Sequence, residues 1–401
     1  MKNKPTVILG VNTSHDTAVA VVEDGIVKHV YEEERSRRSK YWSPSEDNNG
    51  DEPYEELGLV CIEHKQLHSP DYLAFASFDR RDFKVNVTDK VKHDRELQQA
   101  LIKDISSQQL SYEHLVSIQS EYGSSVFQKN TRKEDEDEYI NKSISQQVQP
   151  KNTGVEFKPE HHYFHAVCGS HLSPYEEAIC ITWDGGGWNT YFEDWPGYQE
   201  IECIWHYKNE EVTPLYKRYS NHRFLSDLRN EMNMGGWGED PLMCMNDETY
   251  DYDGVESVFT SLPSMGMNFS NMSYALGCDE HGRAAGKVMG MASYGTLQPD
   301  GSMGNIWNKH TTANKLEHDS LDHAQTVIQK ALDLVPNCKN IVLSGGFSLN
   351  CTNNAKYLKL FPDVQFFVDP IPHDGGTAVG AALDMHRSIL KGEENATDTN
   401  S

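Results

Sequence analysis

The hydrophobic positions of the first thirty residues fall into three short runs separated by polar turns. The runs are strand-like and comprise Thr6–Val11, Ala18–Val22 and Ile26–Tyr31. The dipeptide Asp24-Gly25 lies between the second and third runs and is typical of a two-residue hairpin turn. We therefore expect a β-meander whose first turn, at 12–16, presents polar side chains at the ends of two strands.

A similar order of elements recurs about 170 residues later. The run Ala178–Trp183 is strand-like, the turn Asp184–Gly187 follows it, and a second short strand is expected at Tyr191–Asp194. The pattern then predicts further strands and helices, at 318–334, 340–343, 364–368 and 377–390. This succession of a strand, a polar turn and a second strand occurs twice in the chain. The repeat indicates two related α/β lobes.

The length of 401 residues agrees with two to three domains. We expect a first lobe at 1–175, with a helical insertion at 88–150 where leucines and isoleucines recur at helical spacing. The second lobe is expected at 176–401, with a closing helix at 377–390 and a frayed tail. The polar segment 207–262 shows no clear period and is expected to be irregular.

The net charge of the chain restricts the classes of molecule that it is expected to bind. The chain has 36 Lys and Arg against 61 Asp and Glu, which gives a net charge of −25. Such a surface repels phosphate backbones and anionic lipids, so direct nucleic-acid binding and membrane association are disfavoured. No apolar stretch is long enough to span a membrane. The eight cysteines form no C-x-x-C pair, which favours reduced thiols in the cytoplasm and no cysteine-based zinc site.

The segment His161-His162-Tyr163-Phe164-His165 carries the strongest chemical signal. If it is helical, His161 and His165 project from one face with Cβ atoms about 5–6 Å apart, which suits two ligands of one divalent metal. The pattern H-E-x-x-H of metalloproteases is absent. Ordinary surface histidines are the alternative interpretation.

Two aspartates strengthen the metal hypothesis. Asp184 and Asp374 each follow a predicted strand and precede glycines. In open α/β sheets such strand ends are the usual position of ligands. Two imidazoles with one or two carboxylates suit Fe(II), Mn or Zn. A tight turn is the alternative for each Asp-Gly pair.

Three glycine loops follow strands, at Asp184–Gly187, Ser344–Gly346 and Asp374–Gly376. Glycine lets backbone N–H groups approach an anion closely, so three such loops favour a nucleotide phosphate. Lys287, between glycines, could also reach a phosphate, although a solvated surface lysine is the simpler alternative. His15, beside Asp16, is a candidate general base, or else a turn histidine.

Taken together, six motifs in order resemble the carbamoyltransferases of the NodU/CmcH/TobZ family. They are Ile8-Leu9-Gly10-Val11-Asn12 with His15-Asp16 and Glu32-Glu33-Glu34-Arg35 up to Lys40, His161-His162-Tyr163-Phe164-His165-Ala166, Trp183-Asp184-Gly185-Gly186-Gly187, Gly286-Lys287-Val288-Met289-Gly290-Met291-Ala292-Ser293-Tyr294-Gly295, Ser344-Gly345-Gly346-Phe347-Ser348-Leu349-Asn350-Cys351, and Asp374-Gly375-Gly376 with Gly380-Ala381-Ala382-Leu383. The resemblance covers residues 8–383.

The resemblance implies a two-lobed actin/Hsp70-like (ASKHA) fold with RNase H-like lobes. It also implies transfer of a carbamoyl group from carbamoyladenylate, made from carbamoyl phosphate and ATP, to a hydroxyl of a small-molecule or nucleotide acceptor. A divalent metal, Fe(II) before Mn or Zn, would be bound by His161, His165, Asp184 and Asp374, and His15 would be the catalytic base. The other implied residues are Lys40, Gly185, Gly186, Lys287, Gly345, Gly346, Asn350 and His373 for the nucleotide, and Ser270 for the acceptor.

The sequence departs from the family pattern at two points. Ala285 stands where the family usually has Glu before Gly286. Family members also continue for about 150 residues as a YrdC-like domain that makes carbamoyladenylate. We therefore expect that a separate YrdC-like protein supplies the activated carbamoyl group, or that the chain is truncated.

Three other functions stay open. One is a TsaD-like transferase that modifies a tRNA adenosine, although the doubled histidine and the net negative charge argue against it. Another is a nucleotide-binding regulator of this fold without turnover. The third is a metallohydrolase that splits a phosphoanhydride.

Overall fold

The computed structural model describes residues 5–12, 16–38, 68, 70–77, 155–157, 161–187, 199–220, 247–252, 254–260, 262–278, 283–301 and 308–398. Within the chain, residues 1–168 and 373–401 form one compact unit and residues 169–372 form another. We call them unit 1 and unit 2. The predicted insertion at 88–150, the predicted strand at 191–194, His15 and Lys40 lie outside the described residues.

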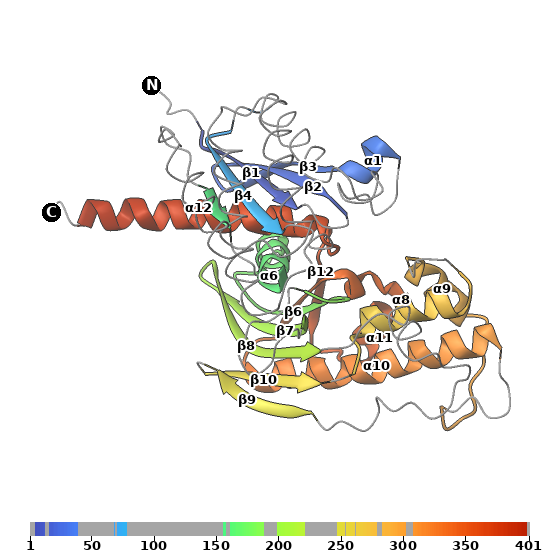
Figure 1. Cartoon of the computed structure of the whole chain (residues 1–401). Helices are drawn as coiled ribbons and strands as arrows, with labels where there is room; N and C mark the ends of the chain where they lie inside the picture. The colour runs from blue at the N-terminus through green and yellow to red at the C-terminus, as the bar shows by residue number, and fades with distance from the viewer. Residues whose placement is uncertain are drawn as a thin grey trace, which may run out of the picture. The chain divides into compact units, whose positions relative to one another are not determined.

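Unit 1 is built on a mixed sheet that begins with the expected β-meander (Figure 1). Its spatial order is β3-β2-β1-β4-β5, with β1 (Val7–Asn12), β2 (Ala18–Glu23), β3 (Ile26–Glu32), β4 (Tyr72–Ser77) and β5 (Val155–Phe157). β2 pairs antiparallel with β1 and β3, while β4 is parallel to β1 and β5 to β4. Asp24 and Gly25 have φ angles of 48° and 76° between β2 and β3, as a type I′ turn requires. The predicted hairpin is confirmed.

In the part of unit 1 that the structure describes, the helices are α1 (Glu33–Arg37), the first part of α6 (His161–Leu172) and α12 (Gly375–Asp398). The long helix α12 packs on β1, β2 and β4 through a face of small apolar residues. Two glycines allow this packing. A Cβ atom on Gly10 would lie 1.8 Å from the carbonyl oxygen of Ala378, and one on Gly380 would lie 2.1 Å from that of Phe164.

This packing differs from the predicted domain division. The closing helix was expected in the second lobe, but residues 373–401 belong to unit 1, and the units divide at 168/169 rather than 175/176. The physical reason is that α12 buries its apolar face against the first strands of the chain, as the Gly10–Ala378 approach shows. Such long-range pairing leaves no signal in the local hydrophobic pattern.

Unit 2 repeats the strand order of unit 1. Its seven-stranded sheet has the order β12-β11-β6-β7-β8-β10-β9, with β6 (Glu177–Trp183), β7 (Gln199–Lys208), β8 (Glu211–Ser220), β9 (Glu248–Tyr252), β10 (Val255–Thr260), β11 (Asn340–Ser344) and β12 (Gln365–Val368). β6, β7 and β8 form an antiparallel meander, and β11 and β12 follow in parallel on the other side of β6. The predicted repeat of strand, turn and strand is therefore a repeat of sheet topology.

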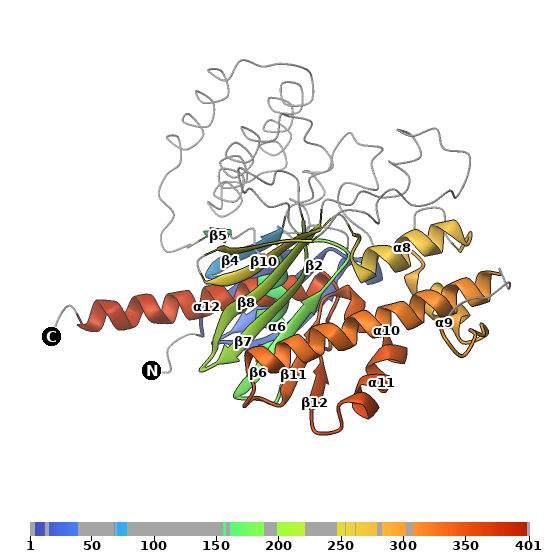
Figure 2. The ribbon, with the colours of Figure 1, turned by 90° about the horizontal axis from the view of Figure 1, so that it is seen from below.

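Among its described residues, unit 2 also contains the end of α6 and a set of further helical elements, namely α8 (Met265–Ala275), α9 (Ala285–Ala292), α10 (Lys309–Leu334), the 3-10 turn η2 (Gly346–Leu349) and α11 (Cys351–Leu360). Their apolar residues form one core with one face of the sheet, and Figure 2 shows α10 running alongside the strands. The expectation of an irregular segment at 207–262 is wrong where the structure describes it, because β8, β9 and β10 are paired strands. Among the described residues, no helix combines the length and apolar character that a membrane span needs.

Candidate metal centre and glycine loops

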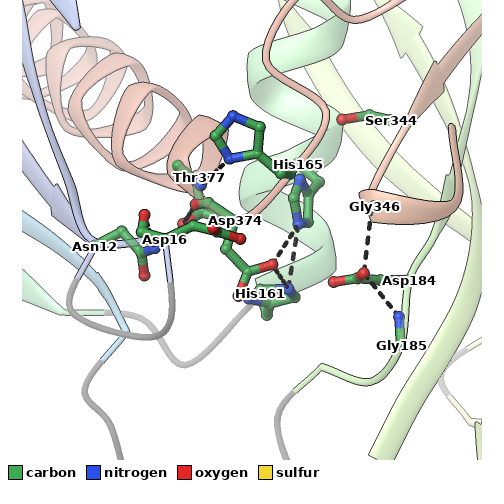
Figure 3. A network of polar contacts seen from close by, with 12 residues as sticks. Asn12, Asp16, His161, His165, Asp184, Gly185, Ser344, Gly346, Asp374 and Thr377 are labelled. Atoms are coloured by element: carbon green, nitrogen blue, oxygen red, sulfur yellow. Dashed lines mark hydrogen bonds and ion pairs between the residues drawn. The ribbon is translucent and has the colours of Figure 1, made fainter. Parts of the chain in front are cut away.

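The helix α6 brings two histidines together inside unit 1 (Figure 3). His161 and His165 are one turn apart, and their Nε2 atoms lie 3.2 Å from each other. Their rings meet edge to face with centroids 4.7 Å apart. Both side chains are buried. The prediction of a helical segment with both imidazoles on one face is confirmed, and the alternative of ordinary surface histidines is wrong.

Asp374 reaches the same point from the segment that begins α12. Its Oδ1 atom lies 3.4 Å from His161 Nε2 and 3.7 Å from His165 Nε2. The backbone holds it in place, because the carbonyl of Asp374 accepts hydrogen bonds from the N–H and the hydroxyl of Thr377. Asp374 is only 4% exposed. Three potential ligand atoms from two elements of unit 1 therefore converge at a buried point.

These three groups have the chemistry and spacing of a metal site. Two ligand atoms at about 2.1 Å from one ion are about 3.0–3.4 Å apart when their bonds make a tetrahedral or right angle. The separations of 3.2, 3.4 and 3.7 Å are close to that range. A carboxylate with two imidazoles is a donor set for Fe(II), Mn or Zn. The residues of unit 1 therefore fit a divalent ion.

Other contacts fix the two helices that carry this cluster. The hydroxyl of Tyr163, on α6, donates a hydrogen bond of 2.6 Å to Asp384 Oδ1 on α12. His373, next to Asp374, accepts a hydrogen bond at Nδ1 from the N–H of Gly375. Its Nε2 therefore carries the proton and donates to Glu32 Oε1 at 3.1 Å. The predicted nucleotide ligand His373 thus ties the start of α12 to the end of β3.

In the polar turn after β1, the structure describes Asn12 and Asp16, which lie on either side of His15. Asn12 is fully buried, and its side-chain amide donates to the carbonyl of Asp16. Asp16 has a φ of 63°, a left-handed conformation that non-glycine residues adopt mainly in special turns. Asn12 and Asp16 are therefore tied to each other by a buried hydrogen bond. The role of His15 as a base stays a prediction.

In unit 2 the two glycine loops meet at Asp184 (Figure 3). Asp184 Oδ1 accepts hydrogen bonds from the N–H of Gly185 at 2.7 Å and from the N–H of Gly346 at 3.2 Å. Gly345 has a φ of +86°, and a Cβ there would lie 2.3 Å from the carbonyl oxygen of Trp183. Only glycine fits this position. The structure thus brings together the predicted loops Asp184–Gly187 and Ser344–Gly346, while the role of Asp184 as a metal ligand stays a prediction.

A chain of buried hydrogen bonds supports these loops. The indole N–H of Trp183 donates to Ser348 Oγ, and that hydroxyl donates to the carbonyl of Ser344. The hydroxyl of Ser344 in turn donates to Asp369 Oδ2 at 2.7 Å. All four side chains are buried. Buried networks of this kind rigidify the backbone when every member has a partner.

Three further predicted residues lie on the helices of unit 2. Asn350 caps α11 by accepting the N–H of Asn353, and its amide donates to Glu317 Oε2. Lys287, on α9, donates to the carbonyl of Cys278 just beyond the end of α8. Ser270 lies partly buried on α8. The side chains of Asn350 and Lys287 therefore have structural partners, and ligand binding by these residues stays a prediction.

Sequence reasoning missed the support of the Asp184 loop by the start of α8. Ser264 accepts the N–H of Met267 as the helix cap, and its hydroxyl donates to the carbonyl of Gly185 at 2.7 Å. A Cβ on Gly266 would lie 2.7 Å from the N atom of Gly185, so glycine allows the helix to approach the loop. The serine before a helical run is a cap signal, but its second contact is long-range and has no local signature.

Comparisons with known proteins give the family context. A family model described as the carbamoyltransferase N-terminus matches residues 7–327 and 323–383. An uncharacterised protein of Synechocystis sp. (sll1178) is 23% identical over 252 residues, which cover 58% of this chain and 37% of that protein. The nodulation protein NolNO of Sinorhizobium fredii is 42% identical over 57 residues, 14% of this chain and 8% of that protein.

Among solved structures, HypF from T. kodakarensis is similar with a TM-score of 0.51 at 12% identity, over 96% of this chain and 48% of that chain. This likeness shows the fold, and with the repeated sheet order it confirms the expected actin/Hsp70-like class. The chain spans only 37% of the length of the Synechocystis relative and about half of HypF.

Proposed function

The chain belongs to the family of the carbamoyltransferase N-terminus, and on that premise we propose that it transfers a carbamoyl group from carbamoyladenylate to a hydroxyl of a small-molecule or nucleotide acceptor. The observation that carries the proposal is the buried convergence of His161, His165 and Asp374. These residues stand in two of the motifs on which the resemblance to the family rests. A buried cluster of this kind has no evident purpose in a protein that only packs helices.

The proposed metal is a divalent ion, Fe(II) before Mn or Zn. His161, His165 and Asp374 would bind it, and Asp184 is proposed as a further ligand from its motif. The ion would act as a Lewis acid on carbamoyl or phosphate oxygens. The hydrogen bond from Tyr163 to Asp384 would keep α6 and α12 in register, and with them the ligands that the two helices carry.

The proposed reaction is a single displacement at the carbamoyl carbon. The acceptor oxygen forms a new C–O bond, and the bond between that carbon and the AMP phosphate oxygen breaks. His15 accepts the proton of the acceptor hydroxyl, and AMP leaves with the bonding electron pair. The products are the O-carbamoylated acceptor and AMP, so atoms and charge balance without a covalent enzyme intermediate.

Backbone N–H groups would bind the nucleotide. We propose that the loops at Gly185–Gly186 and Gly345–Gly346 approach its phosphate, since a glycine backbone leaves N–H groups accessible. Lys40, Lys287 and His373 are proposed to bind the nucleotide as well, and Ser270 the acceptor. Asn350 would act indirectly, because its amide already caps α11 and contacts Glu317.

The proposed reaction needs carbamoyladenylate, which is made from carbamoyl phosphate and ATP with release of phosphate and pyrophosphate. We propose a YrdC-like protein or domain for this step. The net charge of −25 supports a small acceptor rather than tRNA, because a tRNA backbone would be repelled.

The direct test mixes the protein with carbamoyl phosphate, ATP, a YrdC-like protein and a panel of hydroxylated acceptors. We expect AMP release and an acceptor mass increase equal to one carbamoyl group, both dependent on added Fe(II). The variant His161→Ala should abolish transfer, while His206→Ala, which removes a half-exposed histidine of β7, should retain it. AMP release without any carbamoylated product would instead support a hydrolase, and carbamoylated tRNA would support the TsaD-like alternative.

A further inference from the structure

Unit 2 contains a cavity of about 70 Å³ that the proposed reaction does not use. Its walls come from the end of β6, from β7 and β8, from the segment before α8, and from α10 and η2. Trp183, Ile201, Met265 and Phe347 form its apolar lining. One water needs about 10–15 Å³ of such a space, so the cavity has room for a group of about five non-hydrogen atoms.

The polar edge of this cavity contains an arginine with an unused donor. Arg218 donates from Nη2 to Asp247 Oδ2 at 3.1 Å. Its Nε–H is buried, and no acceptor for it exists among the residues that the structure describes. A buried donor without an acceptor carries a desolvation cost. An oxygen atom inside the cavity would remove that cost.

The other charged group at the cavity is already neutralised. Glu202 Oε2 lies 2.6 Å from His323 Nε2, so the carboxylate and the imidazole form an ion pair when His323 is protonated. Burial is the largest single influence on the pKa of His323 and lowers it, but the charge of Glu202, its hydrogen bond to the imidazole and the charge of Asp247 together raise the pKa, so the net shift is upward. Arg218 then remains as the cation with a donor to offer. Asp247 is partly exposed and pairs with Nη2 only, so the buried Nε–H of Arg218 remains the donor that a ligand can use.

These features restrict the class of ligand. A phosphate dianion would need several donors, and the lining is largely apolar. A neutral apolar molecule would leave the Nε–H of Arg218 unsatisfied. A short monocarboxylate provides one charge and an acceptor for the guanidinium, with an aliphatic part for the aromatic wall.

We propose that this cavity is a binding site for a small monocarboxylate of about five non-hydrogen atoms, held by Arg218 against Trp183 and Phe347. The proposal does not depend on carbamoyl transfer. It assigns a second ligand site to unit 2, next to the helix cap Ser264, whose hydroxyl contacts the carbonyl of Gly185.

The test titrates the full chain with propionate and observes the ligand by saturation-transfer NMR. We expect saturable binding with a millimolar Kd, and competition by butyrate but not by inorganic phosphate. The variant Arg218→Gln should weaken binding at least tenfold, and Arg218→Lys should recover part of the loss. Lys208→Gln, which removes an exposed positive charge at the other end of β7, should bind as the wild type does.

A second variant keeps the proposal testable if Arg218→Gln does not fold. Met265→Phe narrows the cavity and leaves Arg218 in place, so binding should again weaken at least tenfold. The proposal is wrong if the wild type shows no saturable propionate binding, which would mean that water fills the cavity. It is also wrong if phosphate competes as well as butyrate, or if folded Arg218→Gln binds with unchanged affinity.

Discussion

The Nε2 atoms of His161 and His165 face each other at 3.2 Å inside unit 1. Two imidazole lone pairs at this distance repel unless a proton or a cation lies between them. The carboxylate of Asp374 beside both rings favours a cation there. This pair of nitrogen atoms is therefore the most specific chemical feature of the described structure.

Metal content tests this feature directly. We expect that protein loaded with Fe(II), Mn or Zn and then desalted retains about one ion per chain. His165→Ala should reduce retention at least tenfold, because it removes one of the buried ligand atoms of the cluster. Elemental analysis of both proteins measures the difference. His171→Ala, on the same helix, is the control, and equal retention in His165→Ala and wild type would contradict the site.

Gly380 makes the approach of α12 to α6 possible. The substitution Gly380→Ala places a Cβ 2.1 Å from the carbonyl oxygen of Phe164, so the backbone must move. We expect a loss of about 1–3 kcal/mol in the free energy of unfolding. The matched control is Gly290→Ala in α9, where a Cβ meets open space, and there a gain of about 0.5–1 kcal/mol is expected. Urea denaturation of the two variants should give opposite signs.

His323 makes the stability of unit 2 depend on pH. Burial lowers its pKa most and the charge of Arg218 lowers it further, but the charge and hydrogen bond of Glu202, together with the charge of Asp247, raise the pKa above the usual value. A raised folded-state pKa stabilises the fold fully below about pH 6.5, and that contribution is lost as pH rises through the folded value. Wild type should therefore lose stability relative to His323→Gln as pH rises above about 6.5. Denaturant unfolding at several pH values checks this, and a constant difference would refute it.

Glu317 should also make the fold less stable as pH rises, but because its charged form is disfavoured in the folded chain. Burial raises its pKa, and the amide of Asn350 and the charge of Lys356 offset this only in part. Ionisation is then harder in the folded chain than in the unfolded chain, so the fold loses stability as pH rises above about 4.5. Glu317→Gln keeps an oxygen acceptor for Asn350 and should be more stable than wild type at neutral pH. If the variant were less stable there, the contact with Lys356 would outweigh the desolvation.

Local signals predicted the elements of the fold well. The Asp24-Gly25 turn, the buried run of β6 and the strand β11 follow from hydrophobic period and turn residues. The placement of α12 could not be derived this way, because it depends on contacts between Gly10 and residues almost 370 positions later. The hairpin of β7 and β8 was missed because the burial of β7 does not alternate and that of β8 alternates only over its first residues.

The candidate site was predictable in part. The i, i+4 spacing of His161 and His165 fixes their common face once the segment is helical, and the Asp-Gly-Gly sequence marked Asp374. The spacing did not show that Asn350 is a buried cap or that Lys287 contacts the end of α8. Those partners are carbonyl, amide and carboxylate groups from other segments, and composition cannot reveal them.

The division of the chain also sets an order of assembly during synthesis. Unit 2 is a continuous stretch nested within unit 1, whose final helix is made last. During synthesis on the ribosome, β1 and β2 cannot pack on α12 until that helix has been made. Unit 2 can already complete its core before then. A chain released at residue 372 should accordingly protect the amides of the β6–β8 meander from hydrogen exchange, and leave those of β1 and β2 unprotected.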